Sequence, residues 1–272
     1  MVLTKTEFLL MVDSVKTFNG IAVASIKTYQ GIAKASVKTV NGIALPVTDP
    51  YFASVVLLAG NENGTDGGTT FIDQSSYART MTRNGNTQWD TAQFPTGMTS
   101  SVLCDGVGDN LTGANGAELD LSNNSMTLEG MIRPANTTQT ASLFEKRASG
   151  AAFAYIAIIQ IGTALTWFCT SNGLTWNIAS ALNIGTVAAN TWYHWAVVRN
   201  GTSFVPYLAG VAGAGTATSA AAITYDTSSI FMGTDAGGAI GFSGWFSNVR
   251  LTNGVARYTA NFTPPTLPLP TS

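Results

Sequence analysis

The sequence predicts an all-β fold: an antiparallel β-sandwich of the jelly-roll type, preceded by a small β-meander. Short β-rich runs separated by turns follow one another from Tyr51 onward, with no helix-period segment of convincing length between them. A long strand rich in apolar residues lies close to the carboxyl end. Only 10% of the 272 residues are charged, against roughly 25% in average globular domains. Gly, Ser, Thr, Asn and Ala fill the difference, as in all-β proteins with many turns.

Charge and hydropathy exclude several classes of partner. The net charge of −2 gives no electrostatic basis for binding nucleic acid or an anionic membrane. No apolar run approaches the roughly 20 residues of a membrane-spanning helix. The apolar run Phe8–Val12 is too short for the apolar core of a signal peptide, so we expect none. We therefore expect neither nucleic acid nor membrane as a partner.

The first twelve residues are apolar without clear periodicity, which leaves two interpretations open. They form either a disordered start or a segment that docks the chain onto a larger assembly. In the predicted domain division, residues 1–12 are the docking segment.

Residues 14–46 contain three copies of an 11-residue repeat: SVKTFNGIAVA, SIKTYQGIAKA and SVKTVNGIALP. Each copy carries a two-residue hairpin turn of the Asn-Gly or Gln-Gly type. Between these turns the sequence predicts nine-residue strands, Ile21–Tyr29 and Ile32–Val40, that form a β-meander. Pairing across the turn places Tyr29 opposite Ile32, Thr28 opposite Ala33 and Ile26 opposite Ala35.

One face of this meander is small and mostly apolar, and a few strands cannot bury such a face by themselves. Sister subunits, a larger assembly or the sandwich itself could cover it. We favour sister subunits, because residues 45–50 (LPVTDP) form a stiff extended linker. Residues 13–48 are therefore predicted to drive homo-oligomerisation. The lysines on the other face are expected to be solvated.

The sandwich is predicted over residues 49–264, and a Pro-rich tail over residues 265–272. Its closing stretch, Gly241–Pro265, begins as a strand whose apolar spacing suits burial on both faces. Asn253-Gly254 then turns the chain, and Pro264-Pro265 ends strand pairing.

Six segments of this region resemble one family. They are TFIDQSS (70–76), SVLCDGVGDNLT (101–112), MTLEGMIRP (126–134), NTWYHWAVVRNG (190–201), FVPYLAGV (204–211) and GWFSNVRLTNGVARYTANFTPP (244–265). They are similar to segments of laminin-G-like (concanavalin A-like) jelly rolls, in the form common in bacteriophage virion proteins. Gly130 and Met131 stand where the family usually has large aromatic residues.

The resemblance implies a bacteriophage virion structural protein: a capsid-decorating, head-fibre or tail-associated protein on the outside of the particle. It implies a trimer, contacts with other virion proteins through the N-terminal part, and contact of the sandwich with glycans on the host surface. The alternative is a free-standing bacterial lectin or adhesin.

Some β-glucanases have the same fold, so we asked whether the carboxylates of this sequence are spaced as a glycoside hydrolase requires. Retaining enzymes need two carboxylates about 5–5.5 Å apart, typically from a strand reading E-x-D-x-(x)-E. The nearest match, Glu118-Leu-Asp120-Leu-Ser122-Asn123, lacks the second glutamate. Glu129 and Glu145 have no spaced partner. We expect no catalysis, and a glycoside hydrolase is the weakest of the three hypotheses.

Calcium is the one inorganic ligand that the sequence suggests. Asp105 and Asp109 lie on a Gly-rich turn, and Asp73 is a candidate third ligand, since Ca²⁺ takes six to eight oxygens. The alternative, which we favour, is a tight turn whose aspartates cap backbone amides. His194 is the only histidine, so the sequence offers no zinc cluster, and we expect His194 to be structural.

A carbohydrate site needs an exposed aromatic platform beside polar groups. Trp176 lies in a turn-bounded segment with Asn172 and Asn177, so these three residues are the candidate carbohydrate contacts. Core packing explains Trp192, Trp195 and Trp245 better. We expect the two cysteines, Cys104 and Cys169, to be free core thiols, with a disulfide as the alternative.

Overall fold

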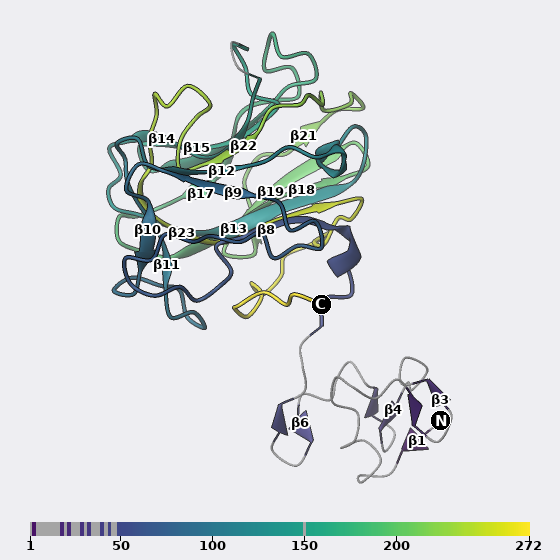
Figure 1. Cartoon of the computed structure of the whole chain (residues 1–272). Coiled ribbons are helices and arrows are strands. Elements are labelled where there is room, and N and C mark those ends of the chain that lie inside the picture. Colours follow the sequence, from purple (N-terminus) through teal and green to yellow (C-terminus); the bar gives the residue numbers. More distant parts are fainter. Residues whose placement is uncertain are drawn as a thin grey trace. The chain divides into compact units, whose positions relative to one another are not determined.

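The computed structural model describes residues 48–148 and 151–272 in full and, before residue 48, only short strand segments (Figure 1). The chain divides into two compact units, Met1–Asp49 and Pro50–Ser272. None of the described helices is long and apolar enough to cross a membrane.

In the first unit, the strands flank the three repeat turns. The antiparallel pairs are β2 (Thr17–Phe18) with β3 (Ile21–Ala22), β4 (Thr28–Tyr29) with β5 (Ile32–Ala33), and β6 (Thr39–Val40) with β7 (Ile43–Ala44). A further strand, β1 (Val2–Leu3), pairs in parallel with β4. Tyr29 lies opposite Ile32 and Thr28 opposite Ala33, so the register predicted across this turn is confirmed.

The rest of the predicted meander lies outside the described residues. This holds for the middle of both nine-residue strands, for the pairing of Ile26 with Ala35, and for most of the 1–12 docking segment. The apolar face of the repeats and its cover stay predictions.

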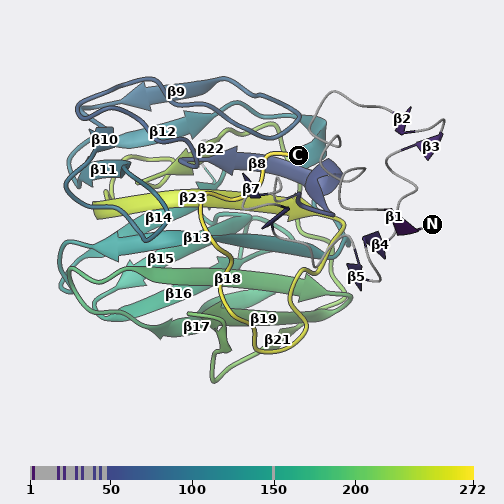
Figure 2. The ribbon, with the colours of Figure 1, turned by 90° about the horizontal axis from the view of Figure 1, so that it is seen from below.

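The second unit is an antiparallel sandwich of two sheets, which confirms the predicted fold class (Figures 1 and 2). The nine-stranded sheet comprises β8 (Val55–Ala59), β10 (Gln88–Asp90), β11 (Ser101–Asp105), β13 (Met126–Pro134), β18 (Tyr193–Asn200), β19 (Ser203–Leu208), β20 (Val211–Ala212), β21 (Ala217–Thr218) and β23 (Ser243–Asn253). The seven-stranded sheet comprises β9 (Met81–Asn84), β12 (Asn110–Gly113), β14 (Thr140–Lys146), β15 (Ile156–Ile161), β16 (Ala164–Cys169), β17 (Ala179–Thr186) and β22 (Ile230–Met232). The 3₁₀ turn η3 (Phe52–Ser54) directly precedes β8, and the 3₁₀ turn η4 (Ala117–Leu119) lies in the loop between β12 and β13.

Strand β23 holds the nine-stranded sheet together, because it pairs with β11, β13 and β8. Phe246, Val249 and Leu251 are buried on it, as the two-sided burial of this stretch predicts. The strand ends at Asn253, and Gly254 takes a left-handed φ of +89°. The predicted turn is therefore confirmed. The following segment is not a strand and runs across the outer face of the sheet (Figure 2).

The core between the sheets includes the fully buried indoles of Trp89, Trp167 and Trp195. Cys104 and Cys169 are both buried there as free thiols, which agrees with the reading of the cysteines as core residues. Burial raises the pKa of both thiols, so they stay protonated and unreactive.

The C-terminal segment covers part of the outer face of the nine-stranded sheet. Tyr258 and Phe262 stack with ring centroids 3.5 Å apart, and they pack over Ala196, Val198 and Tyr207. Beneath them lies Glu129, which is fully buried. The outer face of this sheet is therefore partly a second, smaller core.

Candidate functional site

The three predicted carbohydrate contacts lie in one loop, residues 170–178, which joins β16 to β17. The Trp176 ring is half-buried, with its centroid 4.9 Å from that of Phe153 and 5.0 Å from that of Phe168. These three rings are the aromatic cluster. Leu174, at the tip of the same loop, is 72% exposed. The loop thus presents an apolar, aromatic surface at the rim of the seven-stranded sheet.

The alternation of strand β16 places the cluster on the outside of the sandwich. Trp167 and Cys169 are buried in the core, so Phe168 between them faces outward. Phe153 comes from the loop that precedes β15. The sequence analysis missed both phenylalanines, although the alternation in ALTWFC could have indicated Phe168.

Asn172 and Asn177 build the loop that carries Trp176. The Oδ1 atom of Asn172 accepts hydrogen bonds from the backbone N–H groups of Leu174 (2.9 Å) and Thr175 (3.1 Å). The Oδ1 atom of Asn177 accepts from the Ser171 N–H at 2.9 Å. Each Nδ2 donates one hydrogen bond to a hydroxyl within the loop and keeps a second hydrogen. Both side chains therefore fix the loop and still offer a donor to a ligand.

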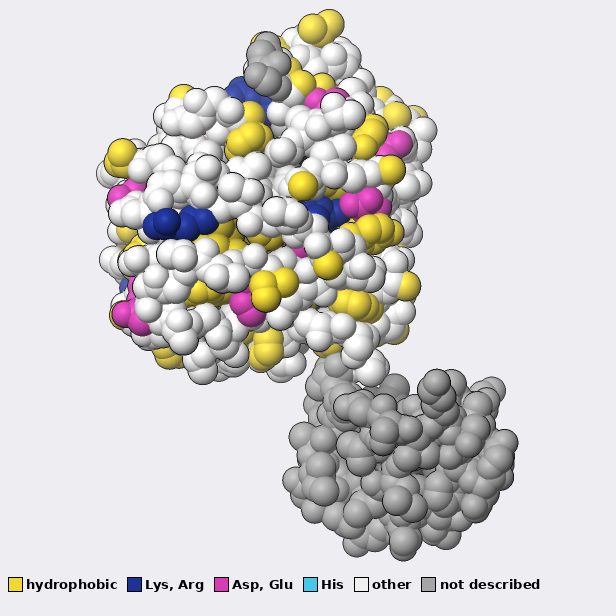
Figure 3. All heavy atoms as spheres, viewed as in Figure 1, with side chains coloured by type: hydrophobic (Ala, Val, Ile, Leu, Met, Phe, Trp, Pro, Cys, Tyr) yellow, Lys and Arg dark blue, Asp and Glu magenta, His cyan; other side chains and the backbone are white. Residues whose placement is uncertain are grey.

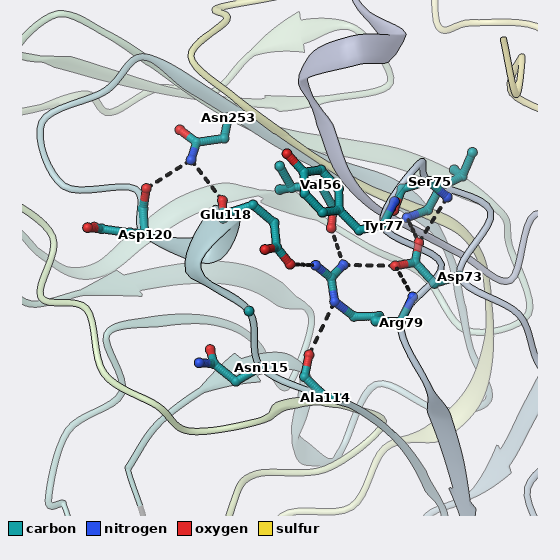
Figure 4. Close-up of polar contacts among 12 residues, drawn as sticks. Val56, Asp73, Ser75, Tyr77, Arg79, Ala114, Asn115, Glu118, Asp120 and Asn253 are labelled. Carbon is teal, nitrogen blue, oxygen red and sulfur yellow. Dashed lines mark hydrogen bonds and ion pairs between the residues drawn. The ribbon is translucent and has the colours of Figure 1, made fainter.

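The carboxylates of the acidic motif are bonded to groups of their own chain. Glu118 lies on the turn η4 rather than on a strand, and its carboxylate forms an ion pair with the Arg79 guanidinium (Figure 4). The Oδ1 atom of Asp120 accepts a hydrogen bond of 2.6 Å from the Ser122 hydroxyl. Arg79 also donates to the backbone carbonyls of Val56 and Ala114. The motif therefore ties loops together at one end of the sandwich.

The three candidate calcium ligands do not come together. Asp73 is 1% exposed and pairs with Arg79 at 2.8 Å (Figure 4). Asp109 accepts hydrogen bonds from the backbone N–H groups of Asp105 (2.9 Å) and Asn86 (2.6 Å). No group of three or more His, Cys, Asp or Glu side chains in the described part of the chain could hold a metal ion. The candidate set of Asp73 with Asp105 and Asp109 is not among the described groups that could hold a metal ion, and Asp73 is paired with Arg79.

The aspartates of the turn instead cap backbone amides. Asp105 Oδ1 accepts the Val107 N–H at 2.7 Å, and Asp109 closes the turn as described above. This is the arrangement that the alternative reading expects for a tight turn. Calcium binding by Asp105 and Asp109 stays a prediction to be tested.

Glu129 and His194 belong to one buried network. The Glu129 carboxylate accepts hydrogen bonds from Arg250 Nε (2.9 Å) and Nη2 (2.7 Å) and from the Tyr258 hydroxyl (2.7 Å). His194 Nε2 lies 3.1 Å from its Oε2 atom. Burial alone would raise the pKa of Glu129, but Arg250, His194 and Tyr258 outweigh it and lower the pKa to about 2. His194 is thus a buried member of this network, as a structural histidine would be.

Glu145 forms an ion pair with Arg147, which the sequence did not indicate. Its Oε1 atom lies 2.9 Å from Arg147 Nε, and Arg147 Nη2 lies 2.7 Å from Asp235 Oδ2. Burial raises the pKa of Glu145 to about 7, although the Ala236 N–H and Arg147 act in the opposite direction. This trio holds the loop after β22 onto the seven-stranded sheet.

The remaining tryptophans are divided between the core and the surface. Trp195 is fully buried, as expected, whereas Trp192 and Trp245 are only partly buried. The assignment of Trp192 and Trp245 to the core is therefore wrong, and Trp245 lies on the outer face of the nine-stranded sheet. On the face of the sandwich seen in Figure 3, charged side chains are few and scattered among uncharged ones.

The fold and these sites define a lectin-like jelly roll. Residues 105–257 match the family model described as the Concanavalin A-like lectin/glucanases superfamily, of the laminin G type. The chain belongs to that superfamily, and the resemblance seen in the sequence motifs is confirmed. No curated protein matches the chain.

Three solved structures of toxin binding domains are similar to the chain. The binding domain of Paraclostridial Mosquitocidal Protein 1 has a TM-score of 0.58 at 12% identity, with 76% of this chain and 50% of that chain covered. The binding domain of botulinum neurotoxin DC has a TM-score of 0.56 at 13% identity, both in complex with rat synaptotagmin II and in complex with SialylT, with 75% and 49% covered. The chain thus spans about half the length of these structures. At such identity, the likeness establishes the fold alone.

Proposed function

We propose that this protein is a non-catalytic structural protein of a bacteriophage virion, whose lectin-like jelly roll contacts glycans on the host surface through the aromatic cluster. The observation that carries the glycan part is the half-exposed Trp176, held against Phe153 and Phe168 in a loop that also offers amide donors. A sugar needs this pairing of an apolar ring surface with hydrogen-bond donors.

The placement of the carboxylates supports a binding role rather than hydrolysis. Glu118 is paired with Arg79, Glu129 with Arg250, and Glu145 with Arg147. A retaining or inverting glycosidase needs one carboxyl group as acid and a second as nucleophile or base, both facing the substrate. Each of these three glutamates instead faces an arginine of its own chain.

The virion assignment rests on the sequence motifs and on the N-terminal repeats. In this proposal, residues 1–48 form a homotrimer and attach to other virion proteins, and the jelly roll is displayed on the particle exterior. Immunogold electron microscopy of phage particles with an antibody against the sandwich tests it. Label at a fixed position on the head or tail is expected, and unlabelled particles would overturn the virion role.

A glycan array on the full chain tests the glycan contact. We expect specific binding that a soluble form of the bound glycan competes away. Trp176→Ala should weaken that binding by roughly 2 kcal/mol, about thirtyfold, as for a central aromatic contact. Phe94→Ala is the matched control, because Phe94 is 42% exposed but lies in the loop before β11, outside the cluster. Binding unaffected by Trp176→Ala would contradict the proposed site.

The second candidate, a free-standing lectin or adhesin, shares the fold with the receptor-binding domains found in the comparison. This candidate would be favoured if the protein bound one glycan specifically and with high affinity, and if purified phage particles did not contain the protein.

A further inference from the structure

A second polar and aromatic surface lies on the outer face of the nine-stranded sheet. Cross-strand pairing aligns Leu103 of β11, Trp245 of β23 and Arg133 of β13 in one row. The next residues along these strands, Val102, Phe246 and Ile132, are all buried in the core. Since successive side chains of a strand alternate between faces, the row points away from the core.

The indole of Trp245 is fixed in this row. Its Nε1 donates a hydrogen bond of 2.5 Å to Oδ2 of Asp90, a residue of the edge strand β10. The other oxygen of Asp90 accepts the Ala92 N–H at 2.6 Å. Because β11 lies between β10 and β23, the indole reaches over β11, across two strand spacings of about 4.8 Å each.

The guanidinium of Arg133 is the unusual member of the row. It lies 4.5 Å from the centroid of the Trp245 ring, a cation–π contact. No residue that the structure describes accepts a hydrogen bond from it, and its Nη1 atom is buried without a partner. More than nine-tenths of buried donors in proteins have an acceptor, and an unpaired one costs free energy. Nη1 itself is closed to solvent, whereas Nε and Nη2 are neither buried nor bonded to the described chain, so these two groups can take an acceptor from outside the chain.

The chemistry of the row indicates what that acceptor is. A guanidinium presents its N–H groups as a planar fork that matches a carboxylate. The indole adds an apolar surface, and Asp90 can accept hydrogen bonds from hydroxyl groups. The backbones of Arg133 and Asp90 lie three strands apart, but both side chains reach the indole: Asp90 Oδ2 lies 2.5 Å from its Nε1, and the Arg133 guanidinium carbon lies 4.5 Å from its ring centroid.

We propose that this row binds an acidic saccharide, with a sugar carboxylate on Arg133, a sugar ring along Trp245 and hydroxyl groups at Asp90. A hydroxyl-rich chain suits the row better than an acidic peptide, because a second carboxylate would meet the negative charge of Asp90. The site is separate from the aromatic cluster, which lies on the other sheet. It can therefore exist whether or not the cluster binds glycans.

Isothermal titration of the full chain with trigalacturonate and with its methyl ester tests the proposal. The two probes share their rings and hydroxyls and differ only in the carboxylates. We expect the acid to bind at least tenfold more tightly than the ester. Arg133→Gln should abolish this preference, Arg133→Lys should keep part of it, and Trp245→Phe should weaken binding of the acid.

The controls separate the row from unspecific charge effects. Arg83→Gln removes an exposed arginine from β9 on the other sheet and should leave binding unchanged. Trp176→Ala should also leave it unchanged, which distinguishes this site from the aromatic cluster. Thermal denaturation shows whether each variant is folded. If Arg133→Gln does not fold, the preference for the acid is measured on Arg133→Lys instead.

Four results would overturn the proposal: equal affinity for acid and ester, no detectable binding of the acid, a preference that survives Arg133→Gln, or tighter binding of a glutamate oligopeptide. The first two would mean that solvent alone meets the accessible N–H groups of Arg133. The last would assign the row to a protein partner.

Discussion

The ion pair of Glu129 with Arg250 offers the sharpest test of how the sandwich is held together. We expect Arg250→Met to destabilise the protein by roughly 3–5 kcal/mol, the usual cost of leaving a buried charge without its partner. The structure supports this size, because Glu129 is fully buried and Arg250 supplies two of its short hydrogen bonds.

The pKa of Glu129 gives an independent estimate. A carboxyl whose pKa falls from 4.5 to about 2 on folding stabilises the native state by roughly 3 kcal/mol at neutral pH. Since the folded-state pKa is the lower one, this stability is complete above pH 4.5 and is lost as the pH falls toward 2. Wild-type stability should therefore decline across this window, and Glu129→Gln should lose that component of the decline.

The assay is urea denaturation of the single variants Glu129→Met and Arg250→Met and of the double variant Glu129→Met/Arg250→Met. The double variant should be more stable than the two single losses together predict, by roughly 2 kcal/mol, because removing both charges leaves neither one unpaired. Leu174→Ala, at a side chain that is 72% exposed, is the control and should change stability by less than about 0.5 kcal/mol. Additive losses in the double variant would refute the coupling.

Three further predictions follow from the other charged groups and from the repeats. Glu145 has a folded-state pKa of about 7, above its ordinary 4.5, so its contribution to stability is complete below pH 4.5 and is lost as the pH rises to 7. Glu145→Gln should remove this slope, at most roughly 3 kcal/mol, from the pH dependence of urea unfolding. EDTA should leave the melting temperature unchanged, since Asp105 and Asp109 already cap backbone amides; a fall that excess calcium reverses would instead show a bound ion. Light scattering should give a trimer for the full chain and monomers with a folded sandwich for Ile26→Asp/Val37→Asp, whereas a monomeric wild type would contradict the oligomeric stem.

Local sequence was enough to predict the features that depend on neighbouring residues. Asn253-Gly254 ends β23 because a left-handed residue is needed there, and glycine adopts that conformation at little cost. The loop around Trp176 follows from Asn172 and Asn177, which bond to backbone groups a few residues away. In both places the interaction partners are close in the chain, so a motif contains most of the information.

The errors arose where the partner is distant in the sequence. Asp73 is paired with Arg79 rather than grouped with Asp105 and Asp109, and Arg79 also pairs with Glu118, a residue 39 positions further on. No spacing rule gives that contact, because the loops are brought together only by the tertiary fold. The alternation of β23 likewise indicates that Trp245 and Phe246 face opposite sides. It does not indicate which of the two sides the core occupies.

The outer face of the nine-stranded sheet shows why this matters for function. Over Glu129 the C-terminal segment supplies Tyr258, whose hydroxyl donates a hydrogen bond to the carboxylate, and Phe262, which stacks on Tyr258, so that part of the face serves stability. Arg133 lies on the same strand, β13, four residues away, yet no described residue accepts a hydrogen bond from its guanidinium. Glu129 and Arg133 thus differ: groups of the same chain donate hydrogen bonds to the Glu129 carboxylate, whereas no described residue accepts one from the Arg133 guanidinium. A donor that the fold leaves unmet beside a fixed indole is the feature expected of a binding surface rather than of a structural one.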